Sequence, residues 1–295
     1  MLNMLYFIKA YIDYEVDKMY KALFMEYPGN VYKAFSLSYD DGFVDDIRLC
    51  ELMKRYNIKG TFNLNSNHIL NGNEKRLNEE QCKNLYSDPL FEVAVHGKYH
   101  SFLAHLATGT AAMEILDDRR ELERIFEKPI FGMVSPYNDI SDDLIEAMKI
   151  CNIKYCRGPK ASLGFEMPEN KHRMIPTCHH NNPELMSLAD EFIALAPLKD
   201  PKFFYVWGHS FEFDRKDNWD MMEKFLEKMS DKDDIWYCTN IEFVEYCDAY
   251  KRLEMDVDMK YIFNPTAYDL YFRVGYPYEK SKHYVIKPGE TLKLV

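Results

Sequence analysis

The chain has 295 residues, of which 47% are hydrophobic and 29% are charged, the composition of an ordinary globular protein. Its formal net charge of −11 at pH 7 argues against nucleic acid and anionic membranes as partners, because phosphate groups are bound by basic surfaces. No stretch of the sequence approaches the roughly 18 apolar residues that a bilayer span requires. We therefore expect neither a nucleic-acid partner nor a membrane partner.

The cysteines and the first residues bear on the compartment. The seven cysteines are an odd, widely scattered set without a Cys-x-x-Cys pair. A disulfide framework is therefore not expected, and a reducing cytoplasm is the predicted location. Charged residues interrupt the apolar start of the chain, and no small-residue cleavage site follows, so we do not interpret this segment as a signal peptide.

Short apolar runs alternate with helical patterns from Val31 onward, which predicts repeated β-α units with parallel, buried strands. The predicted strands are 34–39, 60–64, 92–96, 131–135, 153–157, 203–208 and 235–239. The predicted helices are 46–56, 78–86, 110–126, 142–150, 184–195, 220–230 and 241–251. Seven such units predict an α/β fold, a distorted (β/α) barrel.

The pattern changes after residue 252. Four short strand-like runs follow, with Asn264-Pro265 and Pro288-Gly289 as turn signals. The predicted organisation is an N-terminal extension (residues 1–30), a (β/α) barrel (31–252) and a small C-terminal β-strand appendage (253–295).

Polar or special residues stand at the ends of five of the seven predicted strands. The carboxyl ends of parallel strands meet at one edge of the sheet, where the loops converge and chemistry is usually found. Agreement among several strands is stronger evidence for a site than any one residue. The residues at these ends are Asp40, Asp41, His96, Pro136, Tyr137, Arg157 and His209.

Asp41, His96 and His100 form a candidate metal site. With a helical turn after the strand, two histidines four residues apart lie on one face and reach one ion. Two imidazoles and one carboxylate leave coordination positions open for water, which is the pattern of a catalytic metal site. The alternative is two unrelated histidines beside an incidental acid pair in a turn.

Three further histidines are candidates for a role at this edge. His209 follows a buried-looking strand, and a neutral histidine there can donate or accept a proton near pH 7, unless it is hydrogen-bonded for structure alone. His179 and His180 follow Cys178 and are candidates for further metal ligands. Because this run lacks a matching second half, a loop beside the substrate cleft is the favoured interpretation.

Together these motifs resemble the polysaccharide deacetylases, carbohydrate esterase family 4. Residues 38–42, Ser-Tyr-Asp-Asp-Gly, resemble the family's Thr-Phe-Asp-Asp-Gly motif, and residues 60–62 resemble its second strand. His96 to His100 is similar to its His-(Ser/Thr)-x-x-His metal motif, Pro136-Tyr137 to its Arg-x-Pro-Tyr motif and His209 to its Leu-x-His motif. The resemblance covers residues 31–250 in the family's order.

The resemblance implies a fold and an activity. The fold is a distorted barrel of about seven β-α units. The activity is metal-dependent removal of acetyl groups from N-acetylated or O-acetylated sugars or oligosaccharides, by metal-activated water. Zn²⁺ is the expected ion, with Co²⁺ or another divalent ion as a substitute, and the expected partner is a carbohydrate or a small acetylated substrate.

The resemblance also implies roles for individual residues. Asp40 would be the general base and His209 the general acid, while the backbone N–H of Tyr137 would help to hold the oxyanion. The implied metal ligands are Asp41, His96 and His100. The expected substrate contacts are Pro136, Trp207, His179 and His180.

Two positions depart from the family pattern. Gly97 stands in place of the serine or threonine of the metal motif. Val134 stands where the family has an arginine that pairs with the catalytic aspartate. Arg157, at the end of the next predicted strand, is the predicted substitute for that arginine, and we assign it to the catalytic set.

Two other functions remain open from the sequence. One is a metal hydrolase of another small non-peptide amide on the same scaffold, which the missing export signal favours because polymeric glycans lie mostly outside cells. The other is a non-catalytic glycan-binding homologue, which the joint presence of base, acid and metal ligands disfavours. The sequence does not reveal the oligomeric state.

Overall fold

The computed structural model describes residues 22–158, 160–196, 200–275 and 281–294. They form two compact units. One unit runs from Lys33 to Cys247, apart from residues 198–200, and the other combines the described residues at the two ends of the chain with residue 200.

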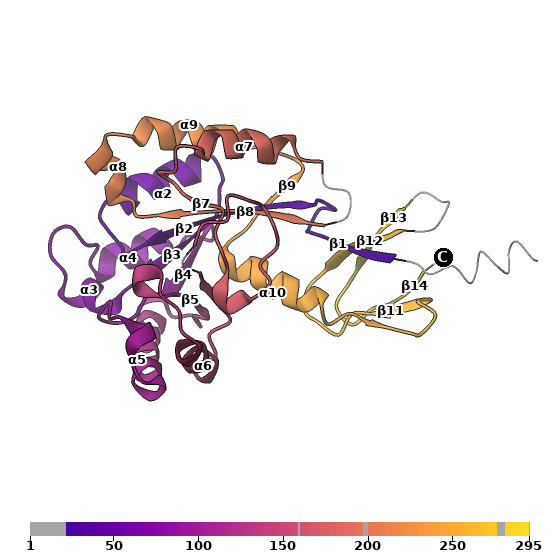
Figure 1. Cartoon of the computed structure of the whole chain (residues 1–295), viewed down its shortest axis with the longest axis horizontal. Helices are drawn as coiled ribbons and strands as arrows, with labels where there is room; N and C mark the ends of the chain where they lie inside the picture. The colour runs from indigo at the N-terminus through magenta and orange to yellow at the C-terminus, as the bar shows by residue number, and fades with distance from the viewer. Residues whose placement is uncertain (1–21, 159, 197–199, 276–280, 295) are drawn as a thin grey trace, which may run out of the picture. The chain divides into compact units, whose positions relative to one another are not determined.

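The larger unit is built on one curled sheet of eight strands, in the order β6-β5-β4-β3-β2-β8-β7, with β9 beside the first half of β2 (Figure 1). Every neighbouring pair in this sheet is parallel. The strands are β2 (Lys33–Asp40), β3 (Gly60–Leu64), β4 (Phe91–Val95), β5 (Gly132–Val134), β6 (Tyr155–Arg157), β7 (Cys178–His179), β8 (Lys202–Gly208) and β9 (Ile235–Tyr237). The predicted α/β fold, a distorted (β/α) barrel, is confirmed.

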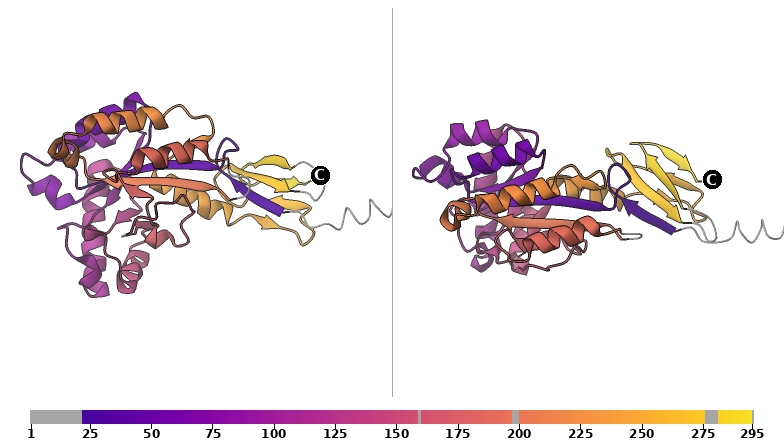
Figure 2. Two further views of the ribbon diagram at one scale, coloured as in Figure 1. Left: turned by 45° about the horizontal axis from the view of Figure 1, so that its top comes forward. Right: turned by 90° about the horizontal axis from the view of Figure 1, so that it is seen from above.

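Helices surround this sheet. Helices α2, α7, α8 and α9 lie on one side of β2 and β8, and α3 to α6 lie around β3, β4 and β5 (Figure 1). Figure 2 shows β2 and β8 running side by side from two further directions. The helices are α2 (Asp46–Arg55), α3 (Ser66–Asn71), α4 (Glu79–Tyr86), α5 (Thr108–Phe126), α6 (Asp142–Ile150), α7 (Leu185–Ala194), α8 (Phe211–Lys216), α9 (Trp219–Met229) and α10 (Asn240–Tyr250), with short 3₁₀ turns at Leu103–His105, Pro136–Asn138 and Lys171–Arg173.

Burial on both faces explains the continuous apolar runs of the sequence. All eight residues of β2 are buried, as expected for a central parallel strand that is covered on both sides. The Phe35 ring packs against Phe204, Phe225 and Tyr237 from two neighbouring strands and one helix. Packing of this kind fixes the direction of β2, and with it the position of the acidic residues at its end.

The smaller unit contains two antiparallel sheets of three strands each, β1-β12-β13 and β10-β11-β14. Strand β1 lies in the predicted N-terminal extension and pairs with β12 over its whole length, while residues 1–21 of that extension lie outside the described residues. In β12, buried and half-buried side chains alternate, as expected for a strand with one face on a core. The strands are β1 (Ala22–Glu26), β10 (Glu254–Met255), β11 (Tyr261–Phe263), β12 (Leu270–Gly275), β13 (Lys282–Ile286) and β14 (Thr291–Lys293).

Two further findings concern membrane spans and the cysteines. Within the described part of the chain, no helix combines the length and the apolar character needed to cross a membrane. All seven cysteines are buried free thiols.

Candidate metal centre and catalytic residues

The acidic pair at the end of β2 is separated by a change in backbone direction. Asp40 is the last residue of β2, and Asp41 has a positive φ of 83°. The N–H of Asp41 donates to the carbonyl of Asn63 at 2.9 Å, which ties it to the end of β3. Arg76 donates to the Asp41 carbonyl and lies 3.7 Å from its carboxylate. The two carboxylates therefore face different partners.

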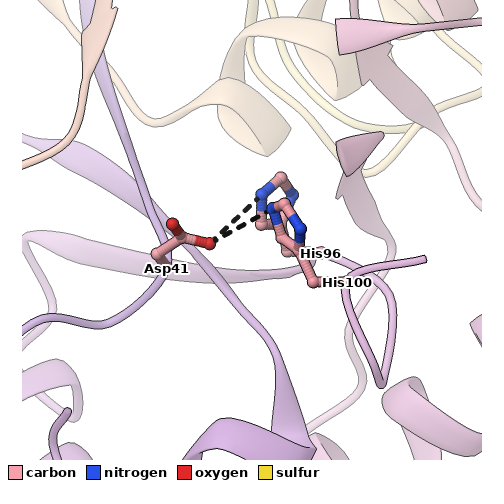
Figure 3. Close-up of side chains that lie close together, drawn as sticks. All are labelled: Asp41, His96 and His100. Carbon is pink, nitrogen blue, oxygen red and sulfur yellow. Dashed lines mark ion pairs between the residues drawn. The ribbon is translucent and has the colours of Figure 1, made fainter. Parts of the chain in front are cut away.

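Asp41, His96 and His100 come together around one point (Figure 3). Asp41 Oδ1 lies 3.6 Å from His96 Nε2 and 3.5 Å from His100 Nε2. Asp41 is 9% exposed, and its Oδ1 has no hydrogen-bond partner among the described residues. Burial of a carboxylate oxygen without a hydrogen-bond donor is energetically unfavourable unless a cation binds it. The three ligand atoms therefore fit a divalent metal such as zinc.

The segment from His96 to His100 is a turn and not the helical turn that the sequence predicted. Gly97 and His100 have positive φ angles of 75° and 53°, and the N–H of His100 donates to the carbonyl of Gly97 at 3.2 Å. A Cβ at Gly97 would lie 3.2 Å from Leu103 and 3.5 Å from Pro136. A glycine suits this position because it accepts the backbone angle without strain. The two imidazoles still converge, but the tight turn brings them together.

Contacts with residues other than Asp41 and His100 orient His96. Its Nδ1 lies 2.8 Å from the carbonyl of Val134, which leaves Nε2 to face Asp41. Its backbone N–H is shared between Leu64 O at 3.0 Å and Asp118 Oδ2 at 3.1 Å. Buried Asp118 also accepts the N–H of Ser66 at 2.7 Å. A backbone acceptor that fixes the histidine tautomer is the usual support of a metal-ligating imidazole.

His100 lies between aromatic and histidine rings. Its ring is 4.7 Å from that of Tyr137 and 6.3 Å from that of His68. Burial and the neighbouring His96 lower the pKa of His100 to about 4, so its imidazole is neutral at pH 7. Neutral imidazole is the form that binds metals.

Arg157 pairs with Asp40, as the sequence predicted. Its Nη1 lies 3.0 Å from Asp40 Oδ1 and its Nη2 lies 2.5 Å from Oδ2, a bidentate contact between two buried side chains. Asn63 donates to the same Oδ1 at 2.8 Å, and the Trp207 ring lies 4.3 Å from the guanidinium. Although burial opposes it, Arg157, with His96 and His209, holds the pKa of Asp40 well below its usual range. Asp40 is therefore ionised at neutral pH.

His209 faces Asp40 with one nitrogen and Glu212 with the other. Its Nε2 is 4.0 Å from Asp40 Oδ2, and its Nδ1 is 2.9 Å from Glu212 Oε1. Burial lowers the pKa of His209, but the hydrogen bond to Glu212 and the negative charges of Asp40 and Asp41 outweigh it and raise the pKa above its ordinary value. A raised pKa keeps the ring protonated to a higher pH, which suits a proton donor.

The remaining predicted site residues lie beside these two groups. Tyr137 has a φ of 59°, is more than half exposed and stacks on Phe102 at a centroid distance of 3.8 Å. Pro136 is buried. Trp207 and His179 are half-buried, their rings 4.6 Å apart, and His180 has no exposed surface.

Three contributors were not predicted from the sequence. Glu212 carries a carboxylate and stands three residues after His209. On a helix this spacing would have identified it as a partner of His209. Asn63 follows from strand pairing, since it stands opposite Asp40 in β3. Asp118 lies in the middle of α5, far from any motif, and no local signal in the sequence identifies it.

Residues 30–156 match the family model described as polysaccharide deacetylase. The matched segment includes Asp40, Asp41, His96, His100 and Tyr137. Over this segment the chain is similar to the polysaccharide deacetylases. The predicted family resemblance is thereby confirmed, and with it the enzyme class, a hydrolase of the deacetylase type. No curated protein sequence matches the chain.

Solved structures show the same fold at low sequence identity. A Mycobacterium smegmatis protein assigned to the polysaccharide deacetylases is 13% identical, with coverage of 78% of this chain and 95% of that one and a TM-score of 0.56. A variant of peptidoglycan deacetylase PdaC from Bacillus subtilis is 15% identical, with coverage of 76% and 97% and a TM-score of 0.50. The Streptococcus pyogenes deacetylase PplD, solved in complex with acetate, is a weaker match that does not bear on the fold: it is 18% identical over 42% of this chain and 55% of its own, with a TM-score of 0.40.

The support of His96 by Asp118 can be tested through stability. Asp118→Ala leaves the N–H of Ser66 without its acceptor and removes one of two acceptors of the His96 N–H. We expect the free energy of unfolding to fall by about 1–3 kcal/mol, the cost of an unsatisfied buried group, in urea denaturation. Asp117→Ala is the matched control, since Asp117 pairs with Arg120 on the surface of the same helix and its loss should cost less than about 1 kcal/mol. Equal effects of the two variants would contradict the assignment.

The pairing of Arg157 with Asp40 can be tested through activity. An ammonium cannot replace the bidentate guanidinium, so Arg157→Lys should lower kcat by about 10–150-fold, the equivalent of one charged hydrogen bond of about 1.5–3 kcal/mol. Metal content and circular dichroism should remain unchanged. Arg173→Lys changes an arginine that pairs on the surface with Asp142, and it should behave as wild type. Wild-type turnover of Arg157→Lys would refute the role.

Proposed function

We infer that the protein is a metal-dependent deacetylase that removes acetyl groups from N-acetylated or O-acetylated sugars or oligosaccharides. The observation that carries this proposal is the buried Asp41 Oδ1, which has no hydrogen-bond partner among the described residues and lies 3.5–3.6 Å from two imidazole nitrogens, beside the separately neutralised Asp40. In our proposal Asp41, His96 and His100 hold the ion, and Zn²⁺ suits this donor set best.

The metal and Asp40 divide the work of activating water. When bound, a divalent ion supplies Lewis acidity, which polarises the acetyl carbonyl and lowers the pKa of water. Asp40 carries the negative charge needed to accept the water proton, because Arg157 keeps it ionised. A carboxylate with so low a pKa is a weak base, so Asp40 depends on the increased acidity of the water.

His209 and Tyr137 act on the other atoms of the acetyl group in this proposal. Glu212 holds Nδ1 of His209, so its Nε2 points toward Asp40 and can protonate the leaving amine or alcohol. Tyr137 stands on a turn beside His100, where its backbone N–H would stabilise the oxyanion. Both roles place a donor at a site where charge develops during the reaction.

A sugar is the substrate class that the surroundings favour. Tyr99, Phe102 and Tyr137 are each more than half exposed, and aromatic rings of this kind suit the apolar faces of sugar rings. The predicted substrate contacts of Pro136, Trp207 and His179 stay predictions, whereas His180 has no exposed surface and we do not propose it as a substrate contact. We place the reaction in the cytoplasm, where the seven buried thiols would remain reduced.

The function is tested by acetate release from acetylated monosaccharides and oligosaccharides, with and without a chelator. We expect release from at least one sugar, its loss on chelation and its recovery with Zn²⁺. His96→Ala should lose one metal ion per chain, since the removal of one of three protein ligands severely weakens a site. Release from small non-sugar amides alone would favour the alternative hydrolase. Sugar binding without any hydrolysis would favour a non-catalytic glycan-binding protein.

The acid role of His209 is tested separately from metal binding. His209→Ala should keep its fold and metal while kcat falls by about 10²–10⁴-fold, the usual contribution of a general acid. A proton donor is lost as the pH rises through its pKa, so the basic limb of the pH–rate profile should disappear in this variant. Near-full turnover on a confirmed substrate would show that another group donates the proton.

A further inference from the structure

A second cluster of side chains of the kinds that bind metals includes Glu212 and two histidines. His179 ends β7, His180 follows it, and Glu212 comes from the first turn of α8. One nitrogen of each imidazole and one carboxylate oxygen lie within 4.8 Å of one another. We propose that His179, His180 and Glu212 form a second divalent-metal site, distinct from the site of Asp41.

The spacing of the donor atoms supports a metal. Glu212 Oε2 lies 3.5 Å from His179 Nε2 and 3.4 Å from His180 Nε2. These separations are longer than a good N–H···O hydrogen bond. Two ligands that are each about 2.0–2.1 Å from a tetrahedral ion lie roughly 3.3 Å apart. The Asp41 site has the same spacing, with corresponding distances of 3.5 and 3.6 Å.

The surroundings hold two of the three donors in place. His180 is fully buried between the rings of Tyr39 and Phe213, and a Cβ at Gly208 would lie 2.1 Å from its Nδ1, so only glycine admits this ring position. Glu212 Oε1 is engaged by His209 Nδ1 at 2.9 Å, which leaves Oε2 toward the two histidines. The second half that the Cys-His-His run lacks in the sequence is thus supplied by Glu212.

Asn181 must adjust when the site is filled. Its side-chain nitrogen lies 2.8 Å from His180 Nε2 and 2.5 Å from Glu212 Oε2. Rotation of this amide would present its oxygen to the cluster as a fourth donor. A matching rotation of Asn218 would preserve their mutual hydrogen bond and give a donor to Asn218 Oδ1, which is buried without a partner in the described structure.

Metal binding would also break a hydrogen bond of His179. Its Nδ1 accepts the backbone N–H of Asn181 at 3.1 Å, so the proton of the neutral ring is on Nε2 in the metal-free chain. Coordination through Nε2 moves that proton to Nδ1 and breaks this bond. His96 meets no such cost, because its Nδ1 already faces a carbonyl. The second site is therefore the weaker of the two.

The test is a Zn²⁺ titration of the chelator-stripped full chain, with bound metal measured by elemental analysis after gel filtration and the binding isotherm by calorimetry. Wild type should bind two ions in two phases. His179→Ala should lose the weaker phase alone, and His96→Ala the tighter phase alone. Glu212→Gln, which keeps the side-chain volume, should also lose the weaker phase. His105→Ala, which removes an exposed histidine outside both clusters, should keep both phases.

One ion per chain in wild type, or a His179→Ala isotherm that still has two phases, would overturn the second site. Loss of the His179-dependent phase with no deacetylation of any substrate would uphold the second site and reject the proposed function. Circular dichroism of each variant separates loss of metal from loss of fold. His179→Gln serves as a second variant if the alanine substitution prevents folding.

Discussion

Two adjacent carboxylates at the end of a fully buried strand are the constraint on which the site depends. Asp40 and Asp41 are both buried, and like charges so close together are unfavourable unless each is compensated. Arg157 and Asn63 compensate Asp40 through three hydrogen bonds. Asp41 Oδ1 has no such donor anywhere in the described chain, and two imidazole nitrogens face it. Different compensation of the two acids underlies their different proposed roles.

Backbone strain is concentrated at the same edge of the sheet. Asp41, His100, Tyr137 and Asn138 all have φ between 53° and 83°, a region that residues other than glycine rarely adopt. Each follows a strand end or lies in the turn after it. Such angles persist where the surroundings determine them, and they tend to occur at functional sites. Here they turn the side chains of adjacent residues toward different partners.

The sequence predicted the parallel strands and the residues at their carboxyl ends because both depend on local pattern. Buried parallel strands appear as apolar runs, and the order of the polar residues after them could be compared directly with a family motif. The pairing of Arg157 with Asp40 was predictable because β5 and β6 are neighbours and pair Val134 with Arg157. Because the two strands are neighbours in the sheet, an arginine on β6 can reach Asp40 in place of one on β5.

Features set by tertiary contacts were not predictable in the same way. Strand β7 has two residues and α8 has six, too few for a periodic pattern, and these elements carry His179 and Glu212. The helical turn expected after His96 is wrong because positive φ angles at Gly97 and His100 produce a tighter turn. Strand β1 pairs with β12, about 250 residues later in the chain, a contact that no local signal reveals.

An anomalous difference map of crystals grown with Zn²⁺, collected on both sides of the zinc absorption edge, tests the central claim most directly. We predict a zinc peak about 2.0–2.2 Å from Asp41 Oδ1, His96 Nε2 and His100 Nε2, with Asp40 still paired to Arg157. Ordered density for these side chains without a zinc peak between them, or Asp40 in place of Asp41 as the ligand, would contradict the division of roles between the two aspartates.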